Sequence, residues 1–128
     1  MSTPFVKQYR EERELTIILA IDISGSENYG SELRSKRERL AELGALLSFS
    51  ANRNGDKIGL LLFSDRVEKY LPPAKGQKHV LRILREILFF SNESKGTDLN
   101  EGLRFINRVL RRRSVVFFLS DFIIQDLH

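Results

Sequence analysis

Three short runs of apolar residues constrain the fold of this chain more than any other feature of its sequence. The runs are rich in Ile, Leu, Val and Phe and cover residues 15–21, 58–63 and 115–119. A continuous apolar run of this length is typical of a strand that is buried on both faces, as in a parallel sheet. Because parallel strands are joined by long crossover connections, usually helical, we expect helices in the segments between the runs.

Apolar residues at helical spacing predict three helices in those segments. The first covers residues 32–53, and the second and third lie around residues 80–88 and 99–110. Small residues on the apolar side of the first helix, such as Gly44, predict that it packs closely against the sheet. The sequence Asn54-Gly55 is a typical end signal for this helix.

A weaker, alternating strand is predicted over residues 67–71. It carries the charged residues Glu68 and Lys69 and is closed by Pro72-Pro73, as is common at the edge of a sheet. The preceding turn, Asp65-Arg66, is too short for a parallel crossover, so this strand must run antiparallel to the one before it.

The order of elements predicts a three-layer, Rossmann-like α/β domain whose sheet is mostly parallel with one antiparallel edge strand. Residues 1–14 form a polar lead-in segment, and residues 15–128 form the domain. The last apolar strand, 115–119, lacks an obvious neighbour on one side. We therefore expect either a domain truncated after its fourth strand or a homodimer formed through residues 115–119. The alternative is a small complete domain.

The composition excludes several classes of site. The chain has 128 residues, 41% hydrophobic and 30% charged, and it contains no cysteine and only two histidines. Disulfides, thiolate metal sites, thiol nucleophiles and multi-histidine zinc sites are therefore excluded. No apolar run approaches the about 18 residues needed to span a bilayer. The first apolar stretch follows an acidic flank rather than the basic flank of a secretory signal, so we expect a cytoplasmic protein that does not contact a membrane through this segment.

The positive charge of the chain is modest. A net charge of +4 permits contact with nucleic acid but does not require it. Five arginines lie between residues 104 and 113. Cations are favourable near a helix C-terminus, and no aromatic residues alternate with these arginines as in a base-stacking surface. We therefore interpret them as a solvated helix end and expect no nucleic-acid partner.

Polar residues at the ends of the apolar strands indicate where a ligand could bind. Asp22 ends the first strand and Asp121 follows the last one closely. In open parallel sheets, ligands bind outside the carboxyl ends of the strands. If these two strands are neighbours, their carboxylates repel each other, and a bound cation is the natural partner.

The loop after the first strand adds further oxygen atoms. Asp22, Ser24 and Ser26 alternate along the chain, and alternate side chains of an extended segment point the same way. Thr97, before the third helix, can add another hydroxyl. This set of hard oxygen donors suits Mg²⁺, Mn²⁺ or Ca²⁺. Each residue alone is commonly a helix cap or a turn residue, but the joint pattern favours a metal site formed by Asp22, Ser24, Ser26, Thr97 and Asp121.

This pattern resembles the metal-ion-dependent adhesion site (MIDAS) of von Willebrand factor A-type (vWA) domains. The segments VKQYREERELTIILAIDISGS, RERLAELGALLSFSANRNGDKIGLLLFSD, KGTDLNEGL and VVFFLSDF are similar to the bacterial branch known as domain-of-unknown-function family fifty-eight. The resemblance implies a sheet with strand order three-two-one-four-five-six, of which this chain holds the first four strands. It also implies a non-enzymatic protein–protein interaction module in which a partner's carboxylate completes the coordination of Mg²⁺. The implied partner is a MoxR-type AAA+ ATPase, in chaperone-like assembly or maturation.

The chain departs from this resemblance after the second serine of the loop. Many relatives have methionine there, whereas this chain has Glu27. The departure affects partner preference, and we expect Glu27, Asn28 and Asp98 to contact the partner.

An enzyme is the competing interpretation. An aspartate after a first strand also occurs in magnesium-dependent aspartyl phosphotransferases and phosphatases, where Asp22 would be the nucleophile. Such enzymes generally have a second acid two residues later, and this position is Ser24 here. Lys95 is the only candidate for the lysine that such an enzyme needs.

Overall fold

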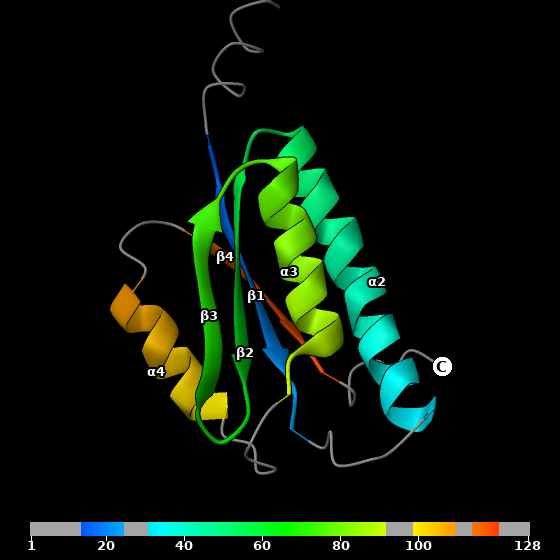
Figure 1. The fold of residues 1–128 in the computed structure, drawn as a ribbon. Helices are drawn as coiled ribbons and strands as arrows, with labels where there is room; N and C mark the ends of the chain where they lie inside the picture. The colour runs from blue at the N-terminus through cyan, green and yellow to red at the C-terminus, as the bar shows by residue number, and fades with distance from the viewer. Residues whose placement is uncertain (1–13, 25–30, 92–98, 110–113, 121–128) are drawn as a thin grey trace, which may run out of the picture.

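A computed structural model of the chain describes residues 14–24, 31–91, 99–109 and 114–120. In the helices that start at residues 31 and 99, it describes side chains from residues 36 and 100 onwards. Within these ranges, four strands and three helices follow one another in the predicted order (Figure 1). Their bounds are β1 Thr16–Asp22, α2 Ser31–Arg53, β2 Lys57–Phe63, β3 Val67–Ala74, α3 Gln77–Phe89, α4 Leu99–Val109 and β4 Ser114–Leu119.

The four strands form one sheet in the order β3-β2-β1-β4. β1 is parallel to both of its neighbours, whereas β3 is antiparallel to β2. The predicted mixed sheet with an antiparallel edge strand is therefore confirmed. Within the described part of the chain, β4 lies at the opposite edge from β3, and Val115 in β4 is 38% exposed.

Helices cover both faces of the sheet, which explains the continuous apolar sequences of β1 and β2. α2 and α3 lie over one face and α4 over the other (Figure 1). In β1, Leu19 and Ile21 belong to the core beneath α2 and α3. Ile18 and Ala20 belong to the core beneath α4, together with Ile106 of that helix. A strand between two helical layers has no solvent-facing side, so it carries no alternating polar residues.

β3 is longer than its sequence pattern suggests. The predicted strand ends before Pro72-Pro73, whereas the observed strand continues through both prolines to Ala74. The pairing with β2 shifts between Leu60 and Ile58, opposite the prolines. Proline lacks the N–H that a central strand needs, but an edge strand with an irregular ladder tolerates it. The expectation that the prolines end the strand was wrong for this reason.

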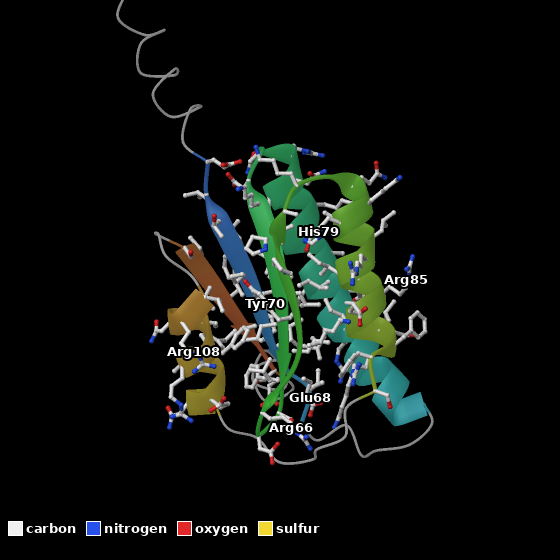
Figure 2. All side chains as sticks on the ribbon, turned by 60° about the vertical axis from the view of Figure 1, so that its left-hand side comes forward. Arg66, Glu68, Tyr70, His79, Arg85 and Arg108 are labelled. Atoms are coloured by element: carbon white, nitrogen blue, oxygen red, sulfur yellow. The ribbon has the colours of Figure 1, made fainter. Side chains whose placement is uncertain are left out.

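α2 and α3 pack closely because Gly44 leaves room between them. A Cβ atom at Gly44 would lie 2.8 Å from Cδ1 of Ile87 in α3 and 3.7 Å from Cδ1 of Leu19 in β1. The close approach that this small residue permits is therefore to α3, whereas its distance to the sheet is that of an ordinary contact. At the other end of α3, Nε2 of His79 donates to the backbone oxygen of Ile58 at 2.8 Å, which fixes the start of α3 beside the start of β2 (Figure 2).

In the part of the chain that the structure describes, no helix is both long enough and apolar enough to cross a membrane.

Candidate functional site

The carboxyl ends of β1, β2 and β4 lie at one edge of the sheet, here named the carboxyl edge (Figure 1). Asp22 is the last residue of β1 and pairs with Phe63, the last residue of β2. Ile21 pairs with Leu119, the last residue of β4, so Ser120 follows at the level of Asp22. The first and last apolar runs are therefore neighbouring parallel strands, which is the condition on which the predicted site depends.

Asp22 and Ser24 interact directly at this edge. One carboxylate oxygen of Asp22, Oδ1, accepts two hydrogen bonds from Ser24, at 2.8 Å from the backbone N–H and at 2.6 Å from the hydroxyl. Between them, Ile23 is 1% exposed, and its N–H donates to the backbone oxygen of Phe63 at 2.9 Å. The buried Ile23 thus holds the start of the loop on the sheet, while the polar residues on either side of it fold towards each other.

The hydrogen bond from Ser24 affects what this pair can bind. Because the hydroxyl hydrogen points to Asp22 Oδ1, the lone pairs of the serine oxygen are oriented away from that carboxylate. A serine oxygen beside a carboxylate oxygen fits a hard cation such as Mg²⁺ or Ca²⁺. The chemistry of this donor pair is therefore compatible with the predicted ion.

The remaining predicted ligands lie outside the described residues. These are Ser26, Thr97 and Asp121, and the same holds for the expected partner contacts Glu27, Asn28 and Asp98. Within the described ranges, no three His, Cys, Asp or Glu residues form a group that could hold a metal. The convergence of all five ligands thus stays a prediction.

The described elements next to those predicted ligands each have one end at the carboxyl edge. β1 and β4 finish there, α2 and α4 begin there, and α3 ends there (Figure 1). Ser26, Thr97 and Asp121 lie in the segments that follow Ser24, precede Leu99 and follow Ser120. The described residues next to these three positions therefore lie at the same end of the sheet.

The pairing of Ser64 with Glu68, a second polar group at the carboxyl edge, was not predicted. Ser64, which follows β2, is fully buried, and its hydroxyl donates to Oε2 of Glu68 at 2.6 Å. The side chain of Glu68 is only 7% exposed, and its Oε2 lies 3.9 Å from Nε of Arg66 (Figure 2). A carboxylate this deeply buried requires such partners, because its desolvation is otherwise costly.

The position of Glu68 results from an irregularity between β2 and β3. Leu62 pairs with Lys69, but Phe63 pairs with Val67, so Glu68 is an extra residue in β3. A bulge of this kind redirects a side chain relative to simple alternation. From the sequence alone, Glu68 was expected to be a charge that protects an edge strand. The Ser-Asp-Arg turn between two strands is a sequence signal for an irregular hairpin, but it does not place the bulge.

The described groups whose pKa is clearly shifted lie elsewhere. The pKa of Glu14 is lowered, chiefly by its hydrogen bond with Lys75 and to a lesser extent by the charges of Lys75 and Lys57. Burial, second in size to the hydrogen bond, opposes this shift. This pair lies beside the amino end of β1. Burial raises the pKa of Tyr70, which packs against Phe105 of α4.

Comparison with protein families gives one match over the whole chain. The family model described as "Protein of unknown function DUF58" matches residues 1–128. The uncharacterized protein Rv1480 of Mycobacterium tuberculosis (strain ATCC 25618 / H37Rv) is 28% identical to this chain over 122 residues. The uncharacterized protein Mb1516 of Mycobacterium bovis has the same identity over the same length. Each alignment covers 94% of this chain and 38% of the relative, so the chain spans well under half the length of these relatives.

A solved structure shows a similar fold. The pilus adhesin RrgA from Streptococcus pneumoniae superposes with a TM-score of 0.57 over 84% of this chain and 20% of the adhesin. The sequence identity is 10%, so the likeness concerns the fold alone.

Proposed function

The chain belongs to the DUF58 protein family, and we propose that it is a protein–protein interaction module of vWA type that acts through a bound divalent cation. The observation that supports this proposal most directly is the position of Asp22. It ends a parallel strand of the sheet interior, beside β4, and its carboxylate is held by the backbone and the hydroxyl of Ser24.

The proposed ion is Mg²⁺, with Mn²⁺ or Ca²⁺ as substitutes. Asp22 and Ser24 would hold it together with Ser26, Thr97 and Asp121. The bound ion would supply a positively charged coordination position that a carboxylate of the partner can fill. In this proposal, Ile23 keeps the Asp22–Ser24 pair in place, because its buried side chain and its bond to Phe63 resist movement of the loop.

The proposed partner is a protein, and the resemblance described above suggests a MoxR-type AAA+ ATPase. Glu27, Asn28 and Asp98 are the proposed contacts beside the ion. The fold is one that a pilus adhesin also uses, which accords with a binding role, although a shared fold does not assign a function by itself.

Calorimetric titration tests the metal site. We expect the chain to bind Mg²⁺ and Mn²⁺ with measurable heat and Asp22→Ala to lose this heat. Asp65→Ala is the matched control, because Asp65 lies in the turn after β2 at the same edge and its side chain is 52% exposed. Equal heats for the wild type and Asp22→Ala would reject the site.

A comparison of binding partners tests the second part of the proposal. Proteins captured from lysate by the wild-type chain are compared in the presence of Mg²⁺, in the presence of EDTA, and with Asp22→Ala. We expect a partner that is lost under both of the latter conditions. A set of captured proteins that is the same under all three conditions contradicts ion-dependent recognition.

The alternative is a magnesium-dependent aspartyl phosphotransferase or phosphatase with Asp22 as the nucleophile. The residue two positions later is Ser24, whose hydroxyl donates to Asp22. A serine is a poor general acid at neutral pH, and this favours the binding module. Turnover of a generic phosphate ester that disappears in Asp22→Asn would instead support the enzyme.

A further inference from the structure

The outer side of α2 carries a stripe of residues that no described element covers. α2 lies at the margin of the helical layer, and no other described helix or strand lies over its outer side (Figure 1). Its inner side is buried against the sheet and α3 through residues such as Leu40, Gly44 and Ala51. On the outer side, Leu46 is 66% exposed and Phe49 is 41% exposed. The stripe lines a shallow hollow and consists of Glu42, Ala45, Leu46, Phe49, Ser50 and Arg53.

The order of residue types in this stripe is symmetric. From either end it runs charged, small, apolar, apolar, small, charged. The charges at the two ends have opposite sign, because Glu42 lies at one end and Arg53 at the other. Within the part of the chain that the structure describes, neither of these two residues takes part in an ion pair. Both are exposed.

This symmetry suits a second copy of the same helix in antiparallel orientation. If a two-fold axis passes between Leu46 and Phe49, each Leu46 meets Phe49 of the other copy. Glu42 then meets Arg53 of the other copy at both ends of the contact. An interface with two-fold symmetry requires this kind of self-complementary surface.

The small residues of the stripe permit a close contact. Ala45 and Ser50 oppose each other in this arrangement, and small side chains let two helices approach to roughly 8–10 Å between their axes. The surface also continues towards α3, because a neighbouring hollow shares Glu42 and Ala45 and includes Leu84 and Leu88. Two exposed apolar side chains alone are common on protein surfaces. Here, however, the two side chains lie between complementary charges, which favours a specific contact.

We propose that two copies of this chain associate through antiparallel packing of their α2 helices, centred between Leu46 and Phe49. The proposal is independent of the proposed metal site, which lies at the carboxyl edge. The six residues of the stripe are fewer than the about 20–30 residues that each partner contributes to a standard interface. We therefore expect a reversible dimer in the micromolar range.

Charge reversal tests this arrangement by analytical ultracentrifugation of the full chain. Glu42→Arg places two arginines opposite each other at both ends of the contact, and Arg53→Glu places two glutamates there. We expect each single variant to weaken dimerisation by roughly tenfold or more. An equimolar mixture of the two variants restores opposite charges at both ends and is expected to form a heterodimer. The double variant is expected to dimerise like the wild type.

The mixture guards against misinterpretation of a folding defect, since mixing cannot repair a misfolded chain. Arg108→Glu is the matched control, because Arg108 is also a basic residue in the last turn of a helix, on α4 across the sheet. This control is expected to leave dimerisation unchanged.

Three outcomes overturn the proposal. The first is a wild-type chain that remains monomeric at every soluble concentration. The second is a pair of single variants that each dimerise as well as the wild type. The third is a dimer that responds to Val115→Lys in β4 but not to the charge reversals on α2, which would place the contact at β4 instead.

Discussion

At the scale of single residues, the Ser64 hydroxyl determines how a charged residue fits at the carboxyl edge. It is buried and donates to the nearly buried carboxylate of Glu68. Removing it leaves an oxygen of Glu68 without this donor in a place that water reaches poorly. Loss of this hydrogen bond is therefore expected to lower stability more than loss of the contacts of exposed neighbouring residues. The reason is that a buried polar group without its partner bears its full desolvation cost.

Ser64→Ala is expected to lower the free energy of unfolding by about 1–3 kcal/mol. The measurement is urea denaturation at neutral pH. Asp65→Ala, at an exposed neighbouring position, is the control and is expected to change stability by less than about 0.5 kcal/mol. Equal effects of the two substitutions would contradict the importance of the Ser64–Glu68 bond.

Tyr70 is expected to make the protein less stable in alkaline solution. Burial raises its pKa above the ordinary value of 10.0. Well below pH 10, Tyr70 is neutral in both the folded and the unfolded protein, so its ionisation does not affect stability. Above it, the unfolded chain ionises first, and stability is lost as the pH rises towards the folded pKa. The ring packs edge-to-face on Phe105, with 5.0 Å between ring centroids.

Tyr70→Phe keeps the ring and removes the ionisable group. We expect the urea midpoint of the wild type to fall more steeply than that of Tyr70→Phe between about pH 9 and pH 11, as linkage requires. The two proteins should differ by a constant amount near neutral pH. Parallel curves over the whole range would show that the tyrosine does not contribute.

At the scale of elements, the helices are positioned by a few residues of types that are unusual at such places, namely a buried arginine and glycines within helices. Arg37 occupies an apolar position of α2 and is 5% exposed. Its Nη1 donates at 2.9 Å to the backbone oxygen of Ile87, near the end of α3. A cation near a helix C-terminus is favourable, since carbonyl groups there lack helical partners. The receiving carbonyl belongs to another helix, so no pattern within α2 indicates this contact.

Two helical glycines are expected to respond in opposite directions to substitution. A Cβ atom at Gly102 in α4 would lie 3.5 Å from the ring of Phe63, an ordinary contact. Gly102→Ala is therefore expected to stabilise the protein by about 0.5–1 kcal/mol through higher helix propensity. At Gly44 the corresponding atom would lie 2.8 Å from Ile87. Gly44→Leu should destabilise by about 1–3 kcal/mol or more, because it overpacks the contact between α2 and α3.

Thermal unfolding of both glycine variants provides the measurement. A lower melting temperature for Gly102→Ala would mean that α4 packs more tightly on β2 than the structure shows. No change for Gly44→Leu would mean that α2 and α3 can separate at little cost.

At the scale of the whole molecule, the proposed ion should connect loops from separate parts of the chain. A ligand that binds only the folded state stabilises it by about 2.7 kcal/mol at 100 times its dissociation constant. We therefore expect saturating Mg²⁺ to raise the melting temperature of the wild type by several degrees. Asp22→Ala should melt at the same temperature with and without Mg²⁺. A Mg²⁺ effect of equal size in this variant would place the ion elsewhere.

The strands and their directions could be predicted because those properties follow from local patterns. Continuous apolar runs identified the strands between helical layers, and the short turn at Asp65-Arg66 required β3 to be antiparallel. The adjacency of β1 and β4 was implied by the vWA resemblance and is confirmed. The extension of β3 through Pro72-Pro73 was missed, since tolerance of proline depends on the neighbouring strand rather than on proline itself.

The candidate site likewise has properties that could be predicted from the sequence and properties that could not. The alternation of Asp22 and Ser24 and the ends of the apolar strands are properties of the sequence, so their position at the carboxyl edge could be predicted. Three properties depend on how the elements pack, which no local pattern contains: the Asp22–Ser24 pair is held against β2 through Ile23, the bulge buries Glu68, and no described element covers the stripe on α2. The sequence alone thus determined the elements and the edge where chemistry can occur. Only the tertiary structure decided which polar groups are buried and which surfaces remain open, because burial is a property of the packed molecule.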